Sequence, residues 1–319
     1  MSAIHMTPPR LATHARAVLS GLSRVGGHPR LPRWLLRDAV GTSRYGALTR
    51  APEHYQERTW ELLLARHADA IADAAAAPHL VELDAQVGER VALADALVAR
   101  HGWLHYIACA ASEAALDGAL ERLRGHSPQI ELERRKTDND LGSALADLPT
   151  PHTTLACGAR FADLGTAEAS ALLDALRLMS SPLDTLVLAF DLAPDHERAC
   201  AAYHDAEGNG AKLGLHALQR VNDELGADFE LARWTPEVRW NEALGRVELV
   251  VVARERQRVF FDALGLPLQF EAGDAIEAAT FQKHDEASID RLLTATRFRR
   301  VATYVDEESC CALVVASPA

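Results

Sequence analysis

The run that decides the fold is His79-Leu80-Val81-Glu82-Leu83, followed by turn residues at 84–88. The run is short and mostly apolar, so it predicts a buried β-strand that ends at the turn. Beyond the turn, over about 89–100, the apolar residues follow the period of a helix. The stretch as a whole predicts a strand followed at once by a helix.

The same unit recurs through the middle of the chain. Further strands are predicted at 105–109, 130–132, 153–157 and 185–190, and helices around 112–123, 141–148 and 167–180. Parallel strands need crossover connections, which helices of this length provide. The sequence therefore predicts an α/β fold, a doubly wound parallel sheet with helices on both faces.

The flanking segments have a different character. Helices are predicted at 11–22, 55–77, 195–203 and 213–225, a strand pair with a turn at Gly245 is predicted at 236–240 and 247–252, and a final hairpin at 299–304 and 310–316. We therefore expect two domains. The sheet domain comprises 61–191 and 284–319, and a discontinuous α+β domain comprises 1–60 and 192–283.

Composition narrows the class of protein. The chain has 319 residues, 48% of them hydrophobic, which is enough for a large core. The formal net charge of −12 disfavours nucleic acid and acidic membranes as partners, because phosphate contacts need basic surface. No run approaches the roughly 20 apolar residues of a membrane helix. The five cysteines lack a CxxC spacing, so we expect a cytoplasmic protein without disulfides.

Several runs, in order and spacing, resemble the histidine Nα-methyltransferase family of ergothioneine biosynthesis. The runs that carry the resemblance include Pro52-Glu53-His54-Tyr55, Ala189-Phe190-Asp191-Leu192, Tyr203-His204-Asp205-Ala206 and 221–229, which reads VNDELGADF. The resemblance covers the chain from about residue 31 onwards. It implies a class I methyltransferase sheet of the Rossmann-like type, S-adenosylmethionine as methyl donor and an amino acid as acceptor.

Most of the donor positions depart from the family's pattern, in which the turn reads Glu-Leu-Gly-x-Gly, although Glu82 keeps the family's glutamate. The positions that the resemblance assigns to the donor are Glu82, Asp84, Gly88, Arg90 and Cys109. Side chains at Asp84 and Gln86, where the family has glycine, crowd the close approach that glycine permits. The ribose-binding acid falls on Cys109 or Ala110, neither of which can accept two ribose hydroxyls as a carboxylate does. The third donor position, an acid in the family, falls on 135–137, which reads RKT. We therefore expect an eroded donor site that binds S-adenosylmethionine poorly or not at all.

The acceptor positions depart from the pattern as well. The resemblance assigns substrate binding to Arg37, Tyr45, His54, Tyr55, Asp163 and Tyr203. Asp163 replaces an asparagine and adds a negative charge, which repels an amino-acid carboxylate. The segment that offers polar partners to imidazole in the family reads AATF at 278–281. Free histidine is therefore not the expected ligand.

Other chemistry has weaker signals. The histidines lack the spacing of a zinc site, so we expect no metal. Cys109 and Cys157 end predicted strands and are interpreted as buried structural thiols, because nothing in the sequence places a base beside them.

Three functions remain open from the sequence. The first is a non-methylating pseudoenzyme that acts as a binding or scaffold partner. The second is a divergent methyltransferase of an amino acid or amine other than histidine. The third is an enzyme with other chemistry in the same cleft, with Asp84, Cys109, Asp163, Tyr203 and His54 as candidate groups. A small amino-acid-like ligand, a protein partner and a second copy of the chain are all compatible with these functions.

Overall fold

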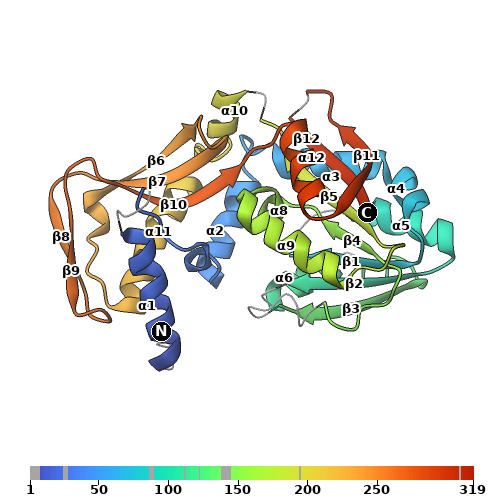
Figure 1. Ribbon diagram of the computed structural model, residues 1–319, viewed down its shortest axis with the longest axis horizontal. Coiled ribbons are helices and arrows are strands. Elements are labelled where there is room, and N and C mark those ends of the chain that lie inside the picture. Colours follow the sequence, from blue (N-terminus) through green and yellow to red (C-terminus); the bar gives the residue numbers. More distant parts are fainter. Residues whose placement is uncertain are drawn as a thin grey trace. The chain divides into compact units, whose positions relative to one another are not determined.

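A computed structural model gives the fold of the chain, and it describes residues 8–23, 28–85, 90–110, 113–121, 123–137, 145–193, 195–308 and 310–319. The chain divides into two compact units (Figure 1). One comprises Met1–His54 with His196–Phe281 and is called the helical-hairpin unit below. The other comprises Tyr55–Asp195 with Gln282–Ala319 and is called the sheet unit.

The sheet unit contains a seven-stranded sheet in the order β11-β12-β5-β4-β1-β2-β3. Its strands are β1 (His79–Leu83), β2 (Leu104–Ala110), β3 (Ile130–Lys136), β4 (Thr153–Ala156), β5 (Thr185–Asp191), β11 (Phe298–Val305) and β12 (Cys311–Pro318). β1 to β5 run parallel, and the β11–β12 hairpin joins them antiparallel at β5. The predicted doubly wound sheet is confirmed. The strand order reverses between β1 and β4, and ligands of such sheets bind at the carboxyl ends of strands beside that point.

Helices cover both faces of this sheet. They are α3 (Gln56–Arg66), α4 (Ala68–Ala74), α5 (Val91–His101), α6 (Glu113–Glu121), α8 (Ala159–Ala162), α9 (Thr166–Met179) and α12 (Glu286–Ala295). The apolar residues of α9 and α12 form one core with β4, β5 and β12, in which Leu173, Phe190 and Leu292 are buried. α3, α4 and α5 pack against one another on the other face (Figure 1). This core fixes the ends of the central strands.

The helical-hairpin unit is built around α11. Its elements are α1 (Pro8–Leu22), η1 (Arg33–Leu36), α2 (Ala39–Thr49), α10 (His196–Ala201), α11 (Asn209–Leu225), η2 (Leu231–Arg233), β6 (Trp234–Asn241), β7 (Arg246–Ala253), β8 (Gln257–Phe261), β9 (Leu266–Phe270) and β10 (Ala275–Gln282). The strands form a sheet of order β10-β7-β6 and a separate β8–β9 hairpin. Leu218 and Val221 of α11 pack on Trp234 and Val251, because the apolar side chains of this helix share one face.

Several elements differ from those predicted. The predicted helix 55–77 is two helices that meet at His67, the C-cap of α3 and the N-cap position of α4. The predicted helix 141–148 lies partly outside the described residues, and 145–147 form a turn. β8, β9, β10 and α12 were not predicted. The sheet unit begins at Tyr55, and α3 packs on β12 within it.

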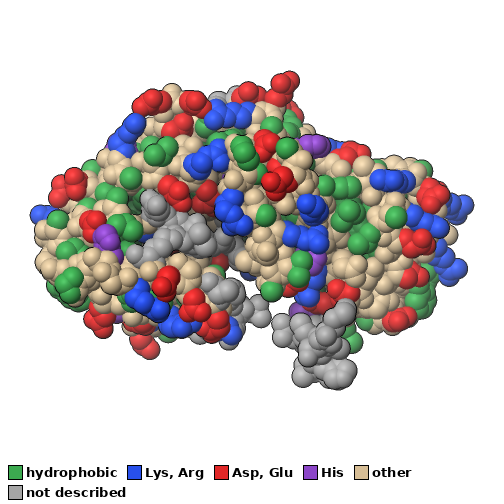
Figure 2. All heavy atoms as spheres, turned by 180° about the vertical axis from the view of Figure 1, so that it is seen from behind, with side chains coloured by type: hydrophobic (Ala, Val, Ile, Leu, Met, Phe, Trp, Pro, Cys, Tyr) green, Lys and Arg blue, Asp and Glu red, His purple; other side chains and the backbone are tan. Residues whose placement is uncertain are grey.

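Two surface features bear on the class of partner. None of the helices in the described part of the chain is long and apolar enough to cross a membrane. On the face seen in Figure 2, acidic and basic side chains are interspersed.

Candidate functional site

The donor positions of the sheet unit are held together by a buried ion pair. Glu82 is the residue before the last of β1 and is 1% exposed, and Arg90, just before α5, is 5% exposed. Arg90 Nε donates to Glu82 Oε1 over 2.9 Å, and its Nη2 donates to the carbonyl oxygen of Cys157 over 2.8 Å. The hydroxyl of Tyr106 on β2 donates to Glu82 Oε2. Both carboxylate oxygens of Glu82 therefore have a donor within the protein.

The turn after β1 carries a side chain in an unusual backbone conformation. Asp84 has a φ of 54°, in the left-handed region that glycine adopts most easily. The next residue, Ala85, is fully buried, and its backbone N–H donates to the carbonyl oxygen of Cys109 over 2.8 Å. The ends of β1 and β2 are thus joined at this turn. Gly88 lies outside the described residues.

The thiol at the end of β2 is poorly suited to bind a ribose. Cys109 is fully buried, and burial raises the pKa of its thiol to about 12. Burial likewise raises the pKa of Cys157 to about 12. Both thiols therefore stay protonated at neutral pH and are neither nucleophiles nor strong hydrogen-bond acceptors.

The third donor position carries two basic residues, Arg135 and Lys136, which pair with nearby groups of the protein. Arg135 Nε lies 2.6 Å from Glu133 Oε1, and its Nη1 donates to the carbonyl oxygen of Ala146 over 2.6 Å. Lys136 Nζ lies 4.0 Å from a carboxylate oxygen of Glu113. None of these contacts supplies an acid to an adenine.

Hydrogen-bond acceptors for S-adenosylmethionine are limited at the donor positions that the structure describes. Its ribose diol and ammonium need acceptors, whereas both oxygens of Glu82 already accept a hydrogen bond from the protein and Cys109 is a neutral thiol. One group remains suited to a ligand: among the described residues, Nη1 of Arg90 is buried without an acceptor. A guanidinium N–H suits a carboxylate, but it cannot replace the missing acids.

The acceptor positions are divided between the two units. Arg37, Tyr45, His54 and Tyr203 belong to the helical-hairpin unit, and Tyr55 and Asp163 belong to the sheet unit. Arg37 is exposed, and its backbone N–H caps the C-terminal end of η1. Tyr45 is half-buried in α2. Asp163 is 1% exposed, and its carbonyl oxygen accepts from the backbone N–H of Gln282 over 3.5 Å.

An aromatic cluster brings two of these positions together. The ring of Tyr203 stacks on Phe281 with centroids 3.7 Å apart and planes at 15°. His54 meets Tyr203 edge-on, with centroids 5.6 Å apart. Tyr203 and His54 are fully buried, and Phe281 is 2% exposed. Phe281 thus packs on Tyr203, a residue that the resemblance assigns to binding of the methyl acceptor.

A small hollow lies next to this cluster. Its lining residues are Tyr203, His204, Asp205, Gly208, Ala211, Pro236, Glu237, Val238 and Leu249, and its volume is about 40 Å³. That volume has room for ordered water.

Tyr55 contributes to a buried polar cluster that sequence reasoning missed. Its hydroxyl donates to Oδ1 of Asp191, the last residue of β5, over 2.9 Å. Gln56 Nε2 and Lys283 Nζ donate to Oδ2 of the same carboxylate over 2.9 and 2.6 Å. Burial, followed by the charge of Asp191, raises the pKa of Tyr55 far above its usual range. The family-like run 189–192 marked this position without showing what Asp191 binds.

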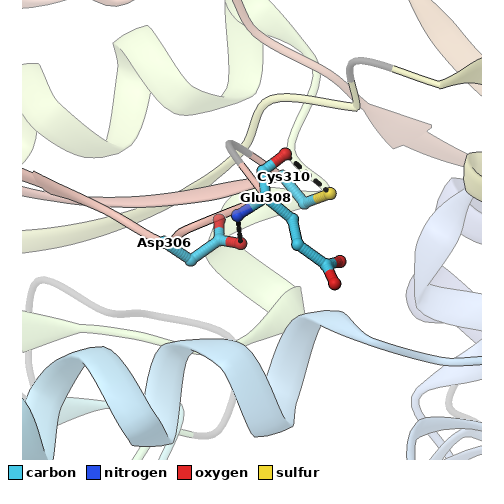
Figure 3. Close-up of side chains that lie close together, drawn as sticks. All are labelled: Asp306, Glu308 and Cys310. Atoms are coloured by element: carbon cyan, nitrogen blue, oxygen red, sulfur yellow. Dashed lines mark hydrogen bonds between the residues drawn. The ribbon is translucent and has the colours of Figure 1, made fainter.

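Three potential metal ligands lie close together in the β11–β12 turn (Figure 3). Asp306, Glu308 and Cys310 have ligand atoms within 4.8 Å of one another. Asp306 accepts from the backbone N–H groups of Glu308 and Cys311 over 3.0 and 2.6 Å, and Cys310 Sγ lies 3.6 Å from the carbonyl oxygen of Glu308. These contacts are those of a turn, and the cluster by itself does not identify a cation site.

The chain is similar to several known proteins. The model of a family described as histidine-specific methyltransferase, SAM-dependent, matches residues 14–318. A histidine N-alpha-methyltransferase of Mycobacterium tuberculosis is 30% identical over 92% of this chain and 91% of its own length. The enzyme of the same name from Mycolicibacterium smegmatis is 32% identical over 76% of each chain. The crystal structure of an S-adenosylmethionine-dependent methyltransferase from Clostridium acetobutylicum covers 88% of this chain and 99% of that one, with 9% identity and a TM-score of 0.46.

Proposed function

The chain belongs to the histidine-specific, SAM-dependent methyltransferase family, and we propose that it is a member that does not transfer methyl groups. In this proposal the protein keeps the fold of the family and serves as a binding or scaffold partner. The observation that carries the proposal is that Arg90 and Tyr106 both donate hydrogen bonds to Glu82 at the carboxyl end of β1.

The donor side supports the proposal through charge. A methyl-donor site needs acceptors left free for the ligand, because a buried carboxylate without a partner is costly in the free protein and is satisfied when the ligand binds. Glu82 is instead satisfied by the protein itself. A donor that competes for Glu82 must break an ion pair whose two side chains are 5% and 1% exposed. A ligand that binds through Glu82 therefore gains little free energy from that contact.

The acceptor side supports the proposal through packing. Phe281 lies in the segment where the family offers polar groups to imidazole, and it stacks on Tyr203. An apolar ring cannot distinguish imidazole from another flat ring by hydrogen bonds. Asp163 adds a carboxylate where an amino-acid carboxylate is expected to bind. Free histidine is therefore a poor ligand in this proposal.

The donor half of the proposal is tested by calorimetry with S-adenosylmethionine and S-adenosylhomocysteine. We expect no binding in the range of about 1–100 μM, in which cofactor sites are normally occupied. The matched variant combines Asp84→Gly, Gln86→Gly and Cys109→Asp, which restores the family's residue types. Tighter binding by this variant supports the assignment of these positions. Micromolar binding by the unaltered protein contradicts the proposal.

The acceptor half is tested by thermal shift with the amino acids. Selective binding to the folded state raises the apparent melting temperature. We expect histidine to give no larger shift than the other amino acids. A shift that singles out histidine contradicts this half of the proposal, whatever the calorimetry shows.

A scaffold also needs a partner, which is either a second copy or another protein. Size-exclusion chromatography with light scattering gives the mass in solution, and a pull-down with a partner enzyme encoded beside this chain tests hetero-association. A strictly monomeric protein that recovers no partner, and loses an activity when Asp84, Asp163 or Tyr203 is replaced, contradicts the scaffold role.

A second candidate is an N-methyltransferase of an amino acid or amine other than histidine. It is favoured by Nη1 of Arg90, a buried donor without an acceptor among the described residues and suited to a carboxylate. The test is transfer of a labelled methyl group from S-adenosylmethionine to a panel of amino acids and amines. Methyl transfer to any member of the panel by the unaltered protein supports this candidate over the first.

A further inference from the structure

The chain crosses between its two units at three places. The crossings are His54–Tyr55, Asp195–His196 and Phe281–Gln282. On the sheet-unit side, residues next to all three crossings bind one carboxylate, that of Asp191. This convergence is not required by the order of the strands, since the three segments are far apart in sequence.

The carboxylate of Asp191 accepts four hydrogen bonds from described residues. Oδ1 accepts from the hydroxyl of Tyr55 over 2.9 Å and from the backbone N–H of Ala193 over 3.0 Å. Oδ2 accepts from Gln56 Nε2 over 2.9 Å and from Lys283 Nζ over 2.6 Å. Each oxygen thus joins two different parts of the chain.

Backbone contacts hold the same segments. The N–H of His284 donates to the carbonyl oxygen of Asp191 over 2.9 Å, and the N–H of Gln282 donates to that of Asp163 over 3.5 Å. Tyr55 directly follows the first crossing, and Lys283 lies one residue beyond Gln282 at the third. Ala193 lies two residues before Asp195 at the second. Each connection is therefore fixed within a few residues of its crossing.

Burial makes these contacts act together. Asp191 is fully buried, and Tyr55, Gln56 and Lys283 are 4%, 1% and 6% exposed. A buried carboxylate that loses one partner is left with an uncompensated charge, so one contact cannot open without weakening the others. The three segments are coupled through a single group.

We propose that Asp191 is a hinge anchor that holds the sheet-unit ends of all three crossings. Its carboxylate couples these three ends, so that they open together and not one at a time. The inference rests on the fold and holds whether or not the protein transfers methyl groups.

The test is hydrogen–deuterium exchange of the full chain, read on peptides covering 52–58, 189–197 and 279–286. Asp191→Asn is expected to speed exchange by about tenfold in all three peptides under conditions where the protein stays folded, because losing a buried hydrogen-bonded charge lowers the cost of local opening. Asp184→Asn is the matched control, since Asp184 is 1% exposed and accepts from the backbone N–H groups of His152 and Ser181 over 2.9 and 2.8 Å. It is expected to speed exchange near 152 and 181 instead.

Two milder variants cover the case in which Asp191→Asn does not fold. Lys283→Met is expected to speed exchange in all three peptides, and Tyr55→Phe is expected to do so most in 52–58. Faster exchange confined to the peptide that carries the substitution overturns the proposal. Equal effects of Asp184→Asn on the three crossing peptides overturn it as well.

Discussion

Nε of Arg90 lies 2.9 Å from Oε1 of Glu82, in an ion pair buried at the carboxyl end of β1. This end of the sheet, beside the reversal of strand order, is where a ligand is expected to bind. The protein's own guanidinium satisfies the carboxylate there. A carboxylate already paired within the protein offers less to a ligand than an open one does.

Removing the cation of this pair should destabilise the protein strongly. Arg90→Met leaves Glu82 buried with Tyr106 as its remaining donor, and breaking a buried pair in this way costs about 3–5 kcal/mol. Adding Glu82→Gln removes the stranded charge and should recover much of that loss. Urea unfolding of the single and double variants measures both effects. A loss below about 1 kcal/mol in the single variant would show that the pair is solvated.

His284 should make stability depend on pH. Burial, followed by the charge of Lys283, lowers the pKa of His284 to about 4. Between that value and about 6.5 the unfolded chain binds a proton that the folded protein does not, so stability is lost as pH falls through this window. The loss between pH 7 and pH 5 should be about 2 kcal/mol.

The control for this prediction is His284→Gln, which cannot titrate in that window. Urea unfolding at pH 7 and pH 5 should show a smaller pH dependence for the variant than for the unaltered protein. The same pH dependence in both proteins would assign it to other groups.

Tyr203 should act mainly in packing. Its ring is fully buried and stacked on Phe281, so Tyr203→Ala is expected to lower the free energy of unfolding by about 3–5 kcal/mol. Tyr203→Phe keeps the ring and should cost about 1 kcal/mol. Denaturant titrations of both variants give the comparison. If Tyr203→Ala left stability unchanged, the stack would not be part of the core.

The cysteines should differ sharply in reactivity. Cys109, Cys157, Cys310 and Cys311 are buried, whereas Cys200 is half-buried. Burial raises the pKa of Cys109 and Cys157 to about 12 and that of Cys311 well above its usual value. Titration of the folded protein at pH 8 with a disulfide reagent should therefore modify Cys200 first, and Cys200→Ser should remove that fast reaction. Rapid modification of the folded Cys200→Ser variant would contradict the burial of the others.

The sequence by itself determined the sheet and its helical connections. Short apolar runs such as 79–83 and 185–190 become strands because their residues favour burial in a sheet, and the helical period between them requires parallel crossovers. The turn at Gly245 was also predicted from the sequence, and its φ of 57° is one that glycine adopts easily. These features depend on neighbours in sequence, which a single chain displays. The β8–β9 hairpin and α12 were not predicted. Their apolar patterns are short, and the segments on either side of them have different hydrophobic patterns.

The tertiary structure alone decided what the polar residues do. Glu82 and Arg90 were recognised as donor positions, but their mutual pairing depends on where β4 and the start of α5 lie around them. Tyr55 is expected from the resemblance to bind substrate, and the structure adds that its hydroxyl donates to Asp191, 136 residues away in sequence. Periodicity specifies which side of an element is buried, whereas the partner of a buried polar group depends on segments that only folding brings together.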